Sequence, residues 1–90
     1  MMTLDRWATL SRREQLLSIA AEFERARAWQ GKDEALFKAA LERALALIDL
    51  ALQVKLESEE LRQFLILRSE VARFYVGERA DNVAVLSRAL

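Results

Sequence analysis

Apolar residues recur every three or four positions along most of this chain, which is the spacing of one face of an α-helix. Four segments show this pattern: residues 12–30, 33–56, 59–76 and, more briefly, 82–89. Ala and Leu dominate these segments, and both residues favour helices. Residues 3–10 form a further short segment in which a single helical turn is expected. The pattern predicts an all-α protein with three main helices and short helical segments at its ends.

Polar residues and glycines mark the ends of the predicted helices. Ser11 and Glu14 have the spacing of a capping box, in which the two side chains satisfy exposed backbone N–H groups at a helix start. Ser58 is expected to cap the third main helix in a similar way. Gly31 and Gly77 supply the left-handed backbone that closes many helices. Because the connections are short, neighbouring helices are expected to run antiparallel, as an up-down bundle that forms one domain.

The middle helix, residues 33–56, has a wider apolar surface than a small bundle requires. Apolar side chains cover more than ~200° of its circumference, whereas an outer bundle helix needs a stripe of ~100°. We therefore expect one side to pack within the chain and the other against a second copy, in a homodimer or larger homo-oligomer. The alternative is that the terminal segments cover this surface within one chain. The residues expected at the interface are Trp29, Leu36, Leu47, Leu50, Ala51 and Val54.

Arg68 interrupts the apolar face of the third main helix. A buried guanidinium is costly unless it is paired. One interpretation is an anion-binding site, where Arg68 would hold a carboxylate or phosphate between helices. The other is a structural ion pair with an acid such as Glu22, Glu42 or Asp49, or a side chain whose charged end extends to the edge of the apolar face. Asp49 itself falls on the polar arc of the middle helix, so we expect it to face solvent rather than an interface.

Composition excludes several classes of chemistry. The 90 residues include no Cys, His or Pro, which removes thiol nucleophiles, imidazole triads and the usual zinc ligands. Metal sites of helical bundles normally combine acids with a Glu-x-x-His spacing, so no metal, cofactor or catalytic residue is expected. Fourteen basic and fourteen acidic residues balance, so the charge of the chain does not favour a nucleic-acid partner.

The sequence also predicts where in the cell the protein is found. No apolar run reaches the ~20 residues of a membrane span, and the first residues do not have the pattern of a signal peptide. A cytoplasmic protein without membrane attachment is therefore expected. Eleven Arg against three Lys, with abundant Ala and Leu, indicate a GC-rich bacterial genome.

These features favour a non-catalytic helical interaction module that self-associates and docks a protein partner. A second hypothesis is a small-molecule anion-binding protein or enzyme that uses Arg68. In size and helical content the chain resembles all-helical chorismate mutases, whose chemistry uses Arg, Lys and acidic or amide side chains and so does not require His or Cys. The resemblance implies an intertwined dimer with cationic residues around a dicarboxylate. The chain departs from that pattern because Gly31 breaks the long first helix and residues 12–30 contain no Lys. A third hypothesis is a nucleic-acid accessory protein that uses Arg12, Arg13, Arg25 and Arg27.

Overall fold

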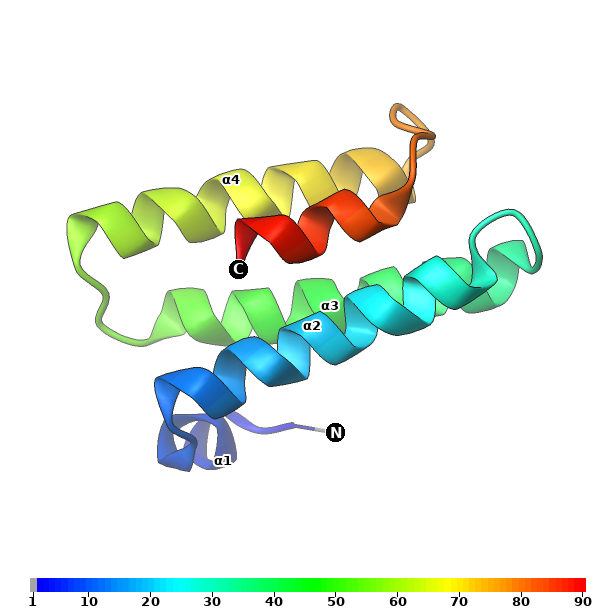
Figure 1. The fold of residues 1–90 in the computed structure, drawn as a ribbon. Coiled ribbons are helices and arrows are strands. Elements are labelled where there is room, and N and C mark those ends of the chain that lie inside the picture. Colours follow the sequence, from blue (N-terminus) through cyan, green and yellow to red (C-terminus); the bar gives the residue numbers. More distant parts are fainter. Residues whose placement is uncertain (1) are drawn as a thin grey trace.

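The computed structural model describes residues 2–90, and its regular structure is helical throughout this range. The elements are α1 (Leu4–Thr9), α2 (Arg12–Trp29), α3 (Glu34–Gln53), α4 (Ser58–Tyr75) and a 3₁₀-helix, η1 (Val83–Ala89) (Figure 1). The predicted all-α bundle with three main helices and short helical segments at its ends is thereby confirmed.

The three long helices run antiparallel to their neighbours in the chain (Figure 1). α3 is the central element, because it packs against α2, α4 and α1. η1 returns beside α2 and α4, so that α2 and η1 lie together on one side of the α3–α4 pair (Figure 1). Together α2, α3, α4 and η1 form an up-down-up-down arrangement, in which η1 is the short fourth element.

One helix start follows the predicted capping chemistry, and a second has a cap that was not predicted. Ser11 Oγ accepts a hydrogen bond from the backbone N–H of Glu14, and Glu14 Oε1 accepts one from the backbone N–H of Ser11. This is the predicted capping box, which satisfies two N–H groups that have no partner inside the helix. Asp33 caps α3 through a bond from the N–H of Leu36. Gly31 and Gly77 have φ angles of 78° and 82°, the left-handed conformation expected after α2 and α4.

Most boundaries lie within one residue of the sequence-based prediction, but the end of α3 and the cap of α4 differ in their local chemistry. α3 ends at Gln53 rather than at residue 56, because Val54 adopts an extended conformation and the chain turns toward α4. Ser58 is the first residue of α4 instead of its cap; Glu57 occupies the cap position and makes no side-chain capping bond. The C-terminal segment is a 3₁₀-helix of seven residues, longer than the roughly three or four residues usual for this form.

The core draws side chains from every helix, and the largest fully buried side chains are Trp7, Ile19, Phe23, Leu41, Ile48, Val71 and Val83. α3 contributes the most positions, which is consistent with its central place. Burying one such side chain stabilises a fold by roughly 1.5–3 kcal/mol. Trp7 brings α1 into this core, so the first helix covers part of the wide apolar surface of α3.

Candidate functional site

The residues predicted to form an interface lie in three different environments. Trp29 and Leu36 are exposed. Leu47, Leu50 and Val54 are half-buried and pack against the core. Ala51 is only 1% exposed, so its predicted place in an interface is wrong for this fold: it faces the chain's own core. α1 and Met2 pack near α3 and cover part of the apolar surface that was predicted to bind a second copy.

Arg68 pairs with Asp49, one of the three acids considered for it. Its Nε lies 2.5 Å from Asp49 Oδ1, and its Nη2 lies 3.4 Å from Asp49 Oδ2. Both side chains remain more than two-fifths exposed, because Arg68 projects from the edge of α4 toward α3 and not into the core. The hydrogen bond and the charge of Asp49 raise the pKa of Arg68 above its ordinary value. An anion that approached Arg68 would have to compete with Asp49.

A second polar contact links the same two helices. The Tyr75 hydroxyl donates to Glu42 Oε1 over 2.5 Å, and Lys38 Nζ lies 5.5 Å from the centre of the Tyr75 ring. The Glu42 carboxylate raises the pKa of Tyr75, mainly through this hydrogen bond and to a smaller extent through its negative charge. This contact was not predicted. The sequence does contain a pattern that could have indicated it. Glu42 and Asp49 are seven residues apart, or about two helical turns, and so are Arg68 and Tyr75 on the antiparallel helix, so a contact between one pair brings the other pair together.

Apolar side chains flank the Arg68–Asp49 pair and, with it, define what we call the α3–α4 face. Leu45 and Leu52 lie three or four positions from Asp49, so they share its side of α3. Leu61 and Leu65 share the side of α4 that carries Arg68, and they are 40% and 51% exposed. Since α2 and η1 occupy the opposite side of the α3–α4 pair, neither of them covers this face (Figure 1). The α3–α4 face therefore consists of Leu45, Asp49, Leu52, Leu61, Leu65 and Arg68.

A groove on the other side of α3 ends at a buried charge. Met2, Ala46, Leu47 and Leu50 line it, and Glu22 and Arg43 form its polar end. Glu22 is the one buried charged residue among residues 2–90. Sequence periodicity did not distinguish it, because its two arginine partners stand three positions away on α2 and 21 positions away on α3.

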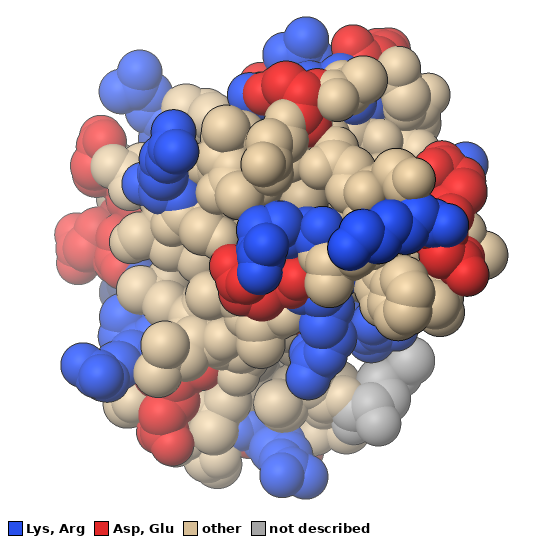
Figure 2. Space-filling model, turned by 45° about the vertical axis from the view of Figure 1, so that its right-hand side comes forward, with Lys and Arg blue, Asp and Glu red and all other residues tan. Residues whose placement is uncertain are grey.

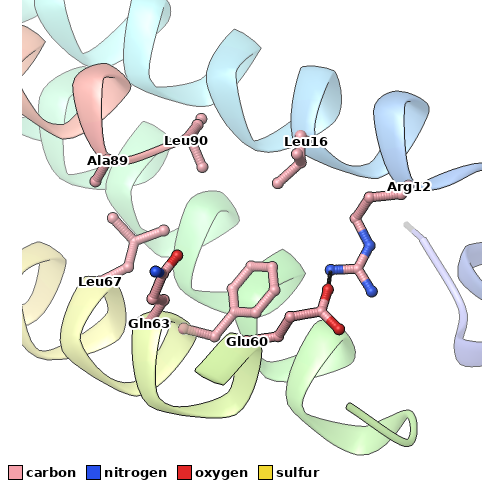
Figure 3. A pocket seen from close by; sticks show the side chains of 8 residues that line it. Arg12, Leu16, Glu60, Gln63, Leu67, Ala89 and Leu90 are labelled. Carbon is pink, nitrogen blue, oxygen red and sulfur yellow. Dashed lines mark ion pairs between the residues drawn. The ribbon is translucent and has the colours of Figure 1, made fainter. Parts of the chain in front are cut away.

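A smaller cleft lies between α2 and α4, in line with the end of η1. In Figure 3, Leu16, Leu67 and Leu90 surround its interior, and the ion pair between Arg12 and Glu60 bridges the two helices beside it. Its volume is about 200 Å³, below the ~300 Å³ at which small-molecule sites usually begin. The two charges neutralise each other, so the cleft offers no unpaired charge to a ligand.

Charged side chains of both signs are interspersed on the face shown in Figure 2. Within the described part of the chain, no group of three or more acidic residues is placed to hold a metal ion. None of the helices in residues 2–90 has the length and apolar content required to cross a membrane.

No protein-family model, curated protein or solved structure matches this chain.

Proposed function

We propose that this protein is a non-catalytic helical interaction module that self-associates, with the α3–α4 face packing against the same face of a second copy. The observation that carries this proposal is the pair of exposed leucines, Leu61 and Leu65, on a face that neither α2 nor η1 covers. Exposed apolar side chains are common singly, but adjacent ones beside half-buried neighbours are typical of interaction sites.

The outer surface of the α3–α4 pair, of which the α3–α4 face is a part, is of the size that a dimer contact needs. α4 has 18 residues and α3 has 20. At 1.5 Å per residue each helix is about 30 Å long, and packed helices lie about 8–10 Å apart. The whole outer surface of such a pair covers roughly 500 Å² in projection, and the six residues of the α3–α4 face lie in the half of it nearest the connection between the two helices. A standard interface buries about 800 Å² per partner, which is of the same order.

The charge of this face also suits a second copy. Arg68 and Asp49 are both present and paired, so the centre of the face is neutral. Two neutral faces meet without the penalty of opposing like charges. Homodimers are the commonest soluble oligomers, and a two-fold axis would place the same leucines on both sides of the contact.

Two leucine variants test this proposal. Leu65→Gln changes the α3–α4 face, whereas Leu17→Gln makes the same substitution at a leucine of α2 that is similarly exposed (51% and 56%). Burial of a leucine contributes roughly 1.5–3 kcal/mol, so Leu65→Gln should weaken self-association about tenfold or more. Sedimentation velocity at a series of concentrations measures this change. Leu17→Gln should associate like the wild type. Equal effects of the two variants would contradict the assignment of the face.

A further inference from the structure

The groove between Met2, α2 and α3 has the size and lining of a small-molecule site. Its walls are the apolar side chains of Met2, Ala46, Leu47 and Leu50, and its volume is about 460 Å³. Ligand sites usually measure about 300–1,000 Å³ and combine apolar walls with a few fixed polar groups. The groove lies on the α2 side of α3, away from the α3–α4 face.

Its polar end is rigidly built around a buried carboxylate. Glu22 is 6% exposed at its side chain and accepts three hydrogen bonds. Arg25 Nη1 donates to Glu22 Oε1 over 2.7 Å, and Arg43 Nε donates to Oε1 and Oε2 over 3.1 and 2.9 Å. A buried carboxylate needs such partners, because an unpaired charge in the interior is strongly destabilising. Glu22 therefore holds the guanidinium of Arg43 in a fixed orientation.

Arg43 keeps binding capacity on its other edge. Only its Nε is used by Glu22, and its two Nη atoms make no hydrogen bond to other residues in the range 2–90. The side chain is 53% exposed and lines the groove. Two guanidinium groups share the single carboxylate of Glu22, which leaves one positive charge in excess. The free edge of a guanidinium binds a carboxylate through two parallel hydrogen bonds.

We propose that this groove binds an anionic ligand with an alkyl chain, such as a medium-chain carboxylate. The anionic group would accept hydrogen bonds from the Nη atoms of Arg43, and the chain would lie against Ala46, Leu47 and Leu50. A free fatty acid and an anionic membrane lipid both have this chemistry, so the experiment includes both sources. The site is separate from the α3–α4 face, and it does not require self-association.

Calorimetric titration with octanoate and butyrate tests the proposal on the intact protein. Each additional buried CH₂ should tighten binding roughly fourfold, so octanoate should bind at least tenfold more tightly than butyrate. Arg43→Gln should weaken octanoate binding at least tenfold. Arg27→Gln is the matched control, because Arg27 is a similarly exposed arginine that pairs with Glu24 on α2. It should leave binding unchanged.

A second variant separates loss of the ligand site from loss of the fold. Ala46→Phe fills the groove at an exposed position and leaves Glu22, Arg25 and Arg43 in place. It should prevent octanoate binding with an unchanged helical circular dichroism spectrum. Binding only to phosphatidylglycerol vesicles, with the same pattern among the variants, would support the site and identify a membrane lipid as the source. Equal binding of butyrate and octanoate, or no binding to either octanoate or vesicles, would overturn the proposal.

Discussion

Tyr75 is the one tyrosine of the chain, and its hydroxyl donates a short hydrogen bond to Glu42. The bond and the negative charge both favour the neutral phenol, so they raise the pKa of Tyr75. A group whose pKa is raised in the folded state contributes stability below its unfolded pKa, which is about 10 for tyrosine. That contribution is lost as the pH rises through the folded pKa. The contact between α3 and α4 is therefore expected to weaken in alkaline solution.

Substitution of Glu42 by Gln should return the pKa of Tyr75 toward its ordinary value, because the amide keeps a similar shape without the charge. The absorbance of the phenolate reports one residue only, so a spectrophotometric pH titration measures the change directly. Glu24→Gln, a change of the same kind on α2, should leave the titration of Tyr75 as it is. An identical titration curve in Glu42→Gln would show that the two side chains do not interact in solution.

At the scale of elements, Gln30 joins the end of α2 to the start of η1. Its Nε2 donates to the carbonyl of Asp81 over 2.7 Å, and its Oε1 accepts from the backbone N–H of Val83 over 2.8 Å. Val83 is fully buried, so this N–H depends on Gln30 for its hydrogen bond. Arg79 also holds the loop, because it pairs with Asp81 and with Glu70 of α4. The hydrogen bonds from Arg79 lower the pKa of both Glu70 and Asp81.

We expect Gln30→Ala to destabilise the fold by about 1–3 kcal/mol, because it leaves the buried N–H of Val83 without an acceptor. Urea unfolding followed by circular dichroism measures the difference in the free energy of unfolding. Gln53→Ala is the control, since Gln53 is exposed at the end of α3. The assigned role of Gln30 would be wrong if the two variants had equal stability.

The three long helices could be predicted because their side chains repeat with the period of the backbone. Ser11, Gly31 and Gly77 marked boundaries by local chemistry that acts within a few residues. The extended segment after Gln53 could not be predicted in this way, since the apolar pattern continues through it to Leu56. The partners of Glu22 were missed for a different reason: Arg43 meets it across two helices, and helical periodicity does not report tertiary contacts.

At the scale of the whole molecule, α3 has three helical neighbours rather than two. α2, α4 and α1 together account for much of its wide apolar surface. Among the described residues, the exposed large apolar side chains include Leu61, Leu65 and Ile66 of α4, whereas α3 keeps only Leu36 in this class. The expectation of self-association thus stays a prediction, and the α3–α4 face is the surface that best fits it.

Sedimentation equilibrium of the wild-type protein over a range of micromolar concentrations tests this account most directly. One chain has a mass of 10.3 kDa. We predict that the weight-average mass rises with concentration toward twice that value, because the α3–α4 face packs against a second copy. A mass equal to that of one chain at every concentration would contradict the account.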